Sequence, residues 1–313
     1  MTDEAIRVGI YVPQLQFAYG DLVTRARDCE ELGFDSFWLF DHLYGAMLPD
    51  LPAFEAWTLA TALLTETTRL RVGHMVLCAT FRHPALLGKM ATTLDVISGG
   101  RLNLGIGSGS VEREHVEAGI PWGSFAERSE ILEETLEIVT RMFAGPRTTF
   151  TGRHFSVHDL PNVPAPVQDP RPPIYVGGIG ERRTLPLVAR FADVWNVPTY
   201  ALDVLAEKSA ALDRSCAAVG RDPGEIRRSL EAVVVVGADD AAVADALPAA
   251  ERRFGSTGFG LRAGGYIGTP TAIADRILAH RDLGFTEFVF FCADRATRPT
   301  LELLAEGVLP RLR

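Results

Sequence analysis

The chain has 313 residues, of which 47% are hydrophobic, and its 31 basic and 40 acidic residues give a formal charge of −9. The apolar fraction is sufficient for a large core, whereas the negative charge argues against nucleic acid or an anionic membrane as the partner. No apolar run approaches the ~20 residues of a membrane span, the start Met1-Thr2-Asp3-Glu4 is unlike a signal peptide, and four scattered cysteines predict reduced thiols in a cytoplasmic protein.

Strand-like apolar runs alternate with amphipathic helical patterns along the chain. The expected strands are 6–12, 36–40, 70–78, the start of 102–110, 174–176, 193–196, 230–236 and 288–291. The expected helices are 21–32, 54–66, 84–98, 125–143, one from 181, 202–219, 270–283 and a last one at the C-terminus. Eight such units predict one (β/α)8 TIM barrel over residues 1–313; a doubly wound sheet is the alternative and fits eight units less well.

Two segments interrupt this alternation. Residues 145–172 are rich in proline and glycine, and residues 239–268 include six glycines after Arg253. Both are expected to be insertions in the loops at the carboxyl ends of the strands. The segment from Gly255 to Gly268 is a candidate lid, because glycine hinges move easily; plain disorder is the alternative.

The active site of a barrel lies at the carboxyl ends of its strands. The residues expected there are Gln14, Asp41, His42, Cys78, Thr80, Ser108, Ser110, Gly177, Gly178, Ile179, Gly180, Trp195 and Asn196. Among them His42 can exchange a proton near neutral pH, and Asp41 can orient it or bind a cofactor. The alternative is a loop-capping Asp41 beside a partly buried, hydrogen-bonded His42.

Two glycine-rich turns follow strands. One contains Gly105, Gly107 and Gly109, and the other contains Gly177, Gly178, Ile179 and Gly180. Glycine lets the backbone approach a ligand, and the second turn opens a helix, where free N–H groups suit a phosphate. Arg182, Arg183 and Thr184 can add charge or hydrogen bonds there. A tight loop before a solvated helix is the alternative.

Metal and nucleophilic chemistry are not expected. His42, His74 and His83 lie near strand ends, but the first strand ends in Pro13-Gln14 rather than in paired histidines, which predicts no metal site. The hydroxyls of Ser108 and Ser110 have no evident His/Asp relay, so contacts to a cofactor suit them better than nucleophilic attack.

The motifs resemble the luciferase-like monooxygenase superfamily and, within it, the coenzyme F420-dependent oxidoreductases. The resemblance lies in residues 82–102, in Phe40-Asp41-His42, in Gly105-Ile106-Gly107-Ser108-Gly109, in residues 112–115 and 118–121, in residues 173–185 and in Ala192-Asp193-Val194-Trp195-Asn196. It covers nearly the whole chain.

The resemblance implies a barrel with insertions that often forms a homodimer. It implies a non-prolyl cis peptide bond between Met75 and Val76, behind the deazaflavin ring, and places His42 near the reactive face of that ring. It further implies that Gly107, Ser108 and Gly109 contact the ring or its ribityl chain, and that Gly177, Gly178, Ile179 and Gly180 hold the phosphate. In the sugar-phosphate dehydrogenase branch a glutamate stands where this chain has Ser110.

The expected function is hydride transfer between C5 of F420 and a small organic substrate, in either direction. His42 is expected to be the proton donor or acceptor, or to stabilise the N1–C2 region of the ring as it gains charge. The expected cofactor contacts are Asp41, His42, Met75, Val76, Cys78, Thr80, Gly107, Ser108, Gly109, Ser110, Gly177, Gly178, Ile179, Gly180 and Arg183. The alternatives are an FMN-dependent monooxygenase of the same superfamily and a non-catalytic flavin- or deazaflavin-binding protein.

Overall fold

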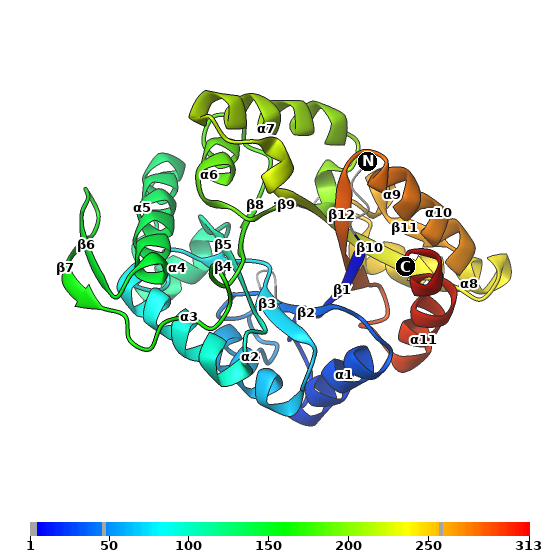
Figure 1. The fold of residues 1–313 in the computed structure, drawn as a ribbon. Coiled ribbons are helices and arrows are strands. Elements are labelled where there is room, and N and C mark those ends of the chain that lie inside the picture. The colour runs from blue at the N-terminus through cyan, green and yellow to red at the C-terminus, as the bar shows by residue number, and fades with distance from the viewer. Residues whose placement is uncertain (1–4, 46–47, 257–258) are drawn as a thin grey trace.

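The computed structural model describes residues 5–45, 48–256 and 259–313. Within them, eight parallel strands close into a barrel (Figure 1). In barrel order these strands are β1 (Arg7–Tyr11), β2 (Ser36–Leu39), β3 (Arg71–His74), β5 (Leu102–Gly107), β8 (Ile174–Gly177), β9 (Val194–Val197), β10 (Arg227–Val236) and β12 (Phe285–Cys292). The short β4 (Leu77–Cys78) continues the line of β3 and pairs with β5. The predicted TIM barrel is confirmed.

Helices surround the barrel on its outer side (Figure 1). They are α1 (Tyr19–Glu31), α2 (Ala56–Glu66), α3 (Pro84–Ser98), α5 (Phe125–Ala144), α6 (Thr184–Phe191), α7 (Leu205–Val219), α10 (Pro270–Arg281) and α11 (Arg298–Gly307). The capping box expected at the start of α5 is present: the Glu127 N–H donates to the Ser124 hydroxyl, and the Ser124 N–H donates to the Glu127 carboxylate. Across the described residues, no helix combines the length and apolarity that crossing a membrane requires.

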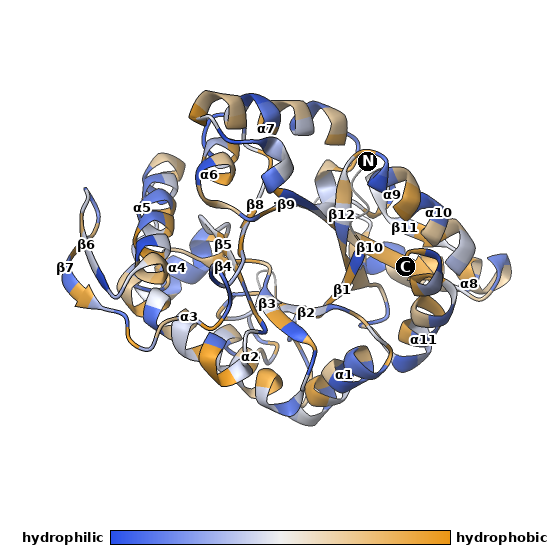
Figure 2. Cartoon of the chain, in the orientation of Figure 1, coloured by the Kyte–Doolittle hydropathy of each residue, from blue (hydrophilic) through white to orange (hydrophobic). Residues whose placement is uncertain are grey.

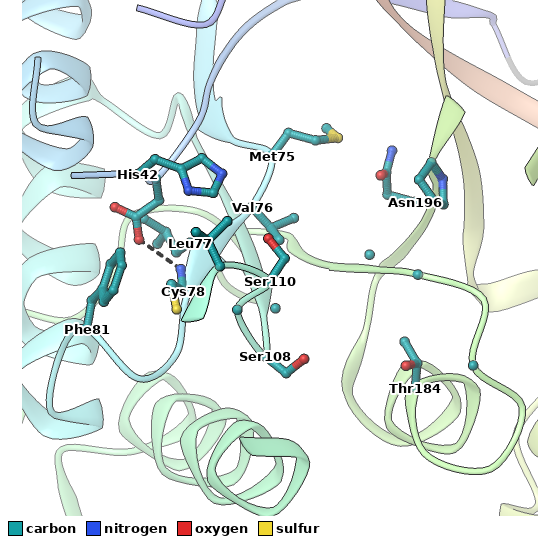
Figure 3. Close-up of a pocket in the computed structure, with 18 of the residues that line it drawn as sticks. His42, Met75, Val76, Leu77, Cys78, Phe81, Ser108, Ser110, Thr184 and Asn196 are labelled. Carbon is teal, nitrogen blue, oxygen red and sulfur yellow. Dashed lines mark hydrogen bonds between the residues drawn. The ribbon is translucent and has the colours of Figure 1, made fainter. Parts of the chain in front are cut away.

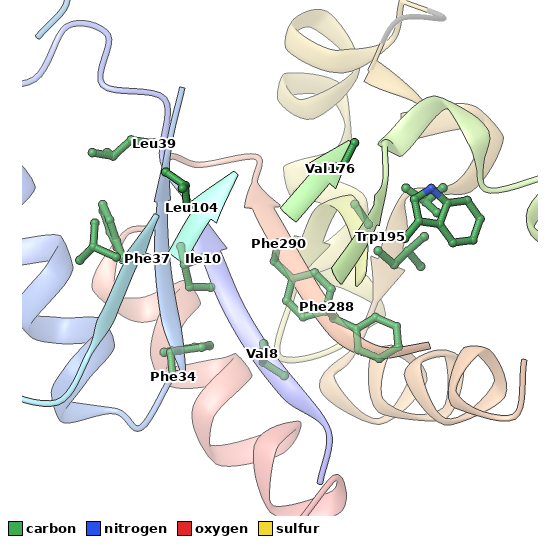
Figure 4. Close-up of a cluster of buried hydrophobic side chains, with 14 of the residues drawn as sticks. Val8, Ile10, Phe34, Phe37, Leu39, Leu104, Val176, Trp195, Phe288 and Phe290 are labelled. Carbon is green, nitrogen blue, oxygen red and sulfur yellow. The ribbon is translucent and has the colours of Figure 1, made fainter. Parts of the chain in front are cut away.

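The main hydrophobic core lies between the strands and the helices. Alternate strand side chains, such as Ile10, Phe37, Leu104 and Phe288, are fully buried on the outer face of the barrel (Figure 4). Burying each such side chain contributes about 1.5–3 kcal/mol. The helices of Figure 2 carry both hydrophobic and hydrophilic residues, as expected for helices with one face on the barrel and one in water.

Aromatic side chains fill the middle of the barrel. The rings of Trp38 and Tyr175 meet edge to face, with their centroids 4.8 Å apart. Trp38 fits because two neighbouring strands carry glycine: a Cβ would lie 2.7 Å from the Trp38 ring at Gly9 and 2.6 Å from it at Gly73. Nearer the amino ends of the strands, Glu287 accepts hydrogen bonds from Tyr175 and Arg227. The interior of the barrel is therefore filled by side chains from its amino end up to the site.

The segment 145–172 differs from its expected position. It follows α5 and forms a hairpin of β6 (Arg147–Thr151) and β7 (Ser156–Pro161) before β8. Beyond the hairpin, the Gln168 side chain accepts from Arg71 and donates to the Leu102 carbonyl, at the first residues of β3 and β5. This insertion therefore lies toward the amino ends of the strands, because it follows a helix rather than a strand.

The segment 239–268 lies after β10, at the carboxyl end as expected, but it is more regular than the sequence indicated. It contains α8 (Asp240–Phe254), α9 (Leu261–Gly264) and β11 (Tyr266–Gly268), which pairs with the end of β10. Residues 257 and 258 of the candidate lid lie outside the described residues. The remaining elements are α4 (Glu112–Ala118), η1 (Thr199–Ala201), η2 (Pro223–Glu225) and η4 (Leu309–Arg311).

Candidate active site

A cavity of about 460 Å³ opens at the carboxyl ends of the barrel strands (Figure 3). This volume is typical of small-molecule sites. Its lining residues are Asp41, His42, Met75, Val76, Leu77, Cys78, Phe81, Gly107, Ser108, Gly109, Ser110, Val111, Glu114, His115, Phe125, Gly177, Gly178, Ile179, Gly180, Thr184, Asn196, Pro198, Tyr200 and Glu231. Both glycine-rich turns face this one cavity.

Four of the residues selected from the sequence do not line the cavity. Gln14 is fully buried, and its amide joins the Phe40 and Phe54 backbones. Trp195 is fully buried in the core outside the barrel. The Thr80 hydroxyl is hydrogen-bonded to Nε2 of His115. Arg183 is exposed at the start of α6. The other selected positions are brought together.

The peptide bond between Met75 and Val76 is cis, as the family resemblance implied. It lies between β3 and β4, and the Val76 side chain projects toward the glycines of two neighbouring strands (Figure 3). A Cβ at Gly107 would lie 2.6 Å from Val76 Cγ2, and one at Gly177 would lie 3.5 Å from Val76 Cγ1. Glycine is needed at Gly107 because the valine occupies the space of a side chain.

Asp41 is held rigidly at the end of β2. Its carboxylate accepts two hydrogen bonds from the Arg82 guanidinium, at 2.7 and 2.9 Å, and a third from the Cys78 backbone N–H at 2.8 Å. The Asp41 side chain is almost completely buried, so the paired arginine offsets the cost of burying its charge. Asp41 thus ties the loop after β2 to the strand that follows the cis peptide bond.

His42 is oriented by Glu114, which the sequence analysis did not select. The Nδ1 atom of His42 lies 2.5 Å from Glu114 Oε1, and the other carboxylate oxygen accepts the Leu43 backbone N–H at 2.8 Å. Glu114 is 1% exposed, whereas His42 is partly exposed. A carboxylate opposite Nδ1 keeps the proton on that nitrogen and leaves Nε2 free to exchange one.

A second histidine, His115, lies beside Glu114 on α4. Its Nδ1 donates to the Val111 carbonyl at 2.9 Å, so in the neutral ring Nε2 accepts from the Thr80 hydroxyl at 2.6 Å. Thr80 in turn lies 3.0 Å from the Cys78 sulfur, and burial raises the pKa of that thiol. This chain of hydrogen bonds fixes the wall of the cavity. The described residues contain no group of three side chains suited to a metal ion.

The second glycine turn is anchored to β9. The Gly178 N–H donates to the Asn196 carbonyl at 3.0 Å, and the Trp195 indole N–H donates to the Gly178 carbonyl at 2.8 Å. Gly178 has a φ of +117°, which favours glycine. The turn leads into α6 through Thr184, whose side chain lies across the cavity from His42 and Ser110 (Figure 3).

The structure adds four polar residues to the site: Glu114, His115, Tyr200 and Glu231. A signal for Glu114 was present, because Val111, Glu114 and His115 share one face of a short helix directly after a strand end. Glu231 lies in the middle of an apolar strand, and the sequence alone does not tell whether its side chain points into the barrel.

Comparisons with known proteins agree with this geometry. The family model described as luciferase-like monooxygenase matches residues 4–259. An F420-dependent glucose-6-phosphate dehydrogenase of Microbacterium testaceum is 31% identical over 98% of this chain and 98% of its own. An F420-dependent secondary alcohol dehydrogenase, solved in complex with an F420-acetone adduct, shares the fold with a TM-score of 0.82 and 20% identity, over 99% of this chain and 100% of its own. A riboflavin lyase, solved with modified FMN and riboflavin, shares it with a TM-score of 0.83 and 16% identity, over 99% of this chain and 92% of its own. The chain belongs to the luciferase-like monooxygenase family.

Proposed function

We propose that this protein is an F420-dependent oxidoreductase acting on a small organic substrate. The observation that carries the proposal is the oriented pair of His42 and Glu114 at a cavity that both glycine turns line. The relative from Microbacterium testaceum and the secondary alcohol dehydrogenase are both named as F420-dependent enzymes, which supports the same cofactor for this chain.

The residues of the cavity fit a planar, phosphorylated cofactor. Met75, Val76 and Leu77 form an apolar wall in which the cis peptide bond turns the chain. Opposite, the turn at Gly177, Gly178, Ile179 and Gly180 runs into the amino end of α6, whose partial positive charge favours a phosphate. A Cβ at Gly180 would lie 3.0 Å from the Thr184 hydroxyl, so a side chain there would crowd the turn.

Bound F420 supplies the carbon that donates or accepts the hydride. His42 exchanges the accompanying proton through Nε2, because its Nδ1 is engaged by Glu114. Glu114 also stabilises the imidazolium that forms when His42 accepts a proton from an alcohol. Gly107, Ser108 and Gly109 hold the cofactor by backbone contacts, and the exposed Ser110 lies at the mouth of the cavity.

The proposal is tested by fluorescence titration of the purified protein with F420 and with FMN. We expect micromolar binding of F420 and at least a hundredfold weaker binding of FMN. The riboflavin lyase of the same fold was solved with modified FMN, so an FMN-dependent enzyme is the second candidate. Preferential binding of FMN would overturn the F420 assignment, and binding without any turnover of alcohols or ketones would favour a carrier.

We infer further that the protein is a cytoplasmic homodimer. Helix α3 exposes Leu86 and Ile97, which are 56% and 52% accessible, and a second copy would cover these apolar side chains. The four cysteines are free and buried, which suits a reducing compartment. Light scattering after gel filtration should give twice the mass of the chain, and an L86E/I97E variant should give a monomer.

A further inference from the structure

The side chain of Glu231 presents a carboxyl group to the cavity, and no described residue pairs with it. Glu231 lies on β10, opposite Val289 of β12 in the sheet register, and its side chain lines the same cavity as His42. None of the hydrogen bonds or ion pairs found among the described residues involves this carboxyl. A carboxyl group in an apolar setting is stabilised when a ligand supplies the missing hydrogen bond.

The surroundings of Glu231 contain little charge to balance it. Its ionisable neighbours are the phenols of Tyr11 on β1 and Tyr200 on η1, and the negative charge of Glu231 contributes to raising the pKa of both. Pro198, which follows β9, lines the cavity, and Val289 of β12 lies opposite Glu231 in the sheet register. Burial raises the pKa of Glu231 to about 7, so the carboxyl changes charge near neutral pH.

Among the described residues, no lysine or arginine side chain lines the cavity to pair with an anionic substrate. The lining residues include the acidic Asp41, Glu114 and Glu231. A phosphate group beside Glu231 would therefore meet a like charge in a site of low polarity. This differs from what recognition of a sugar phosphate requires, although several relatives, including the one from Microbacterium testaceum, are named as glucose-6-phosphate dehydrogenases.

We propose that Glu231 contacts the substrate directly and makes this site select uncharged hydroxyl or carbonyl compounds over phosphorylated ones. The inference rests on the proposed function only in placing the substrate in this cavity. Glu231 accepts a hydrogen bond from an alcohol when ionised and donates one to a carbonyl oxygen when protonated. Its charge repels a phosphate, and Ser110 at the mouth of the cavity adds no charge.

Two measurements on the F420-loaded protein test this role. Infrared difference spectroscopy at pH 6, with Glu231→Gln as the reference, identifies the C=O band of the protonated Glu231 carboxyl. We expect cyclohexanol to shift this band and glucose 6-phosphate to leave it unchanged. Equilibrium binding of glucose 6-phosphate at pH 8 should be at least tenfold tighter in Glu231→Gln than in the wild type, because the repelling charge is gone.

The control is Glu225→Gln, which removes an exposed carboxylate on η2, outside the cavity. It should behave as the wild type in both measurements. The proposal is overturned if cyclohexanol does not shift the Glu231 band. It is also overturned if the wild type and Glu231→Gln bind glucose 6-phosphate with equal affinity, or if neither protein binds it detectably. If F420 does not bind, the proposed function fails, but both measurements on the cofactor-free protein still decide the role of Glu231.

Discussion

The Nδ1 atom of His42 lies 2.5 Å from Oε1 of Glu114, although 72 positions separate the two residues in the chain. The carboxylate is anchored by a second hydrogen bond, from the Leu43 N–H. Two contacts from one buried glutamate therefore fix both the ring of His42 and the loop that carries it. Among the described residues, no hydrogen bond engages the other ring nitrogen of His42, Nε2, and His42 lines the cavity.

Replacing Glu114 by glutamine tests this relationship. Glutamine keeps the shape, but it no longer favours a protonated Nδ1 or stabilises a charged imidazolium. We expect kcat to fall about 100-fold, with the F420 dissociation constant changed less than threefold. The control Glu112→Gln alters an exposed residue of the same helix and should leave kcat unchanged.

Removing the imidazole of His42 separates catalysis from cofactor binding. We expect His42→Ala to lower kcat by about 10²–10⁴-fold, because a positioned proton donor or acceptor contributes that much. The F420 affinity should stay within about threefold of the wild type. His158→Ala, on the exposed face of the β6–β7 hairpin, is the matched control. Unchanged turnover in His42→Ala would show that another group exchanges the proton.

A methyl group at Gly107 tests the fit between β5 and the bulge at Val76. Because the added Cβ would lie 2.6 Å from Val76 Cγ2, Gly107→Ala should cost about 1–3 kcal/mol of unfolding free energy and weaken F420 binding. In α1, a Cβ at Gly20 would meet open space, so Gly20→Ala should be neutral or stabilise by about 0.5–1 kcal/mol. Urea denaturation measures both; equal stability of the two variants would contradict this view of the bulge.

Stability should fall with acidification partly because of His74. Burial lowers the pKa of this histidine to about 4, while its ring stacks on Trp57 and bonds to the Ala56 carbonyl. Between pH 6.5 and 4 the unfolded chain therefore binds a proton that the folded chain does not, so the free energy of unfolding decreases as pH falls.

The size of the effect follows from that difference in pKa. From pH 7 to pH 5 His74 should account for a loss of about 2 kcal/mol. His74→Phe keeps the stack on Trp57 and cannot titrate. Urea unfolding at the two pH values should show that this variant loses about 2 kcal/mol less than the wild type. Identical losses in both proteins would mean that His74 is not the group responsible.

The sequence by itself determined the barrel, the position of all eight strands and the family. Hydrophobic periodicity is local, and the strand-turn-helix signals around Gly107 and Gly177 extend over only a few residues. Because parallel strands bring their carboxyl ends to one face, strand order was enough to place His42 beside both turns.

Only the tertiary structure decided which side chains complete the site. Glu114 meets His42 across 72 positions, and whether Glu231 points into the barrel or toward a helix depends on how the strand is rotated in the sheet. The same is true of Gly107, whose missing side chain makes room for Val76 of a neighbouring strand. These relationships join residues that are remote in the chain, so they arise only when the barrel closes.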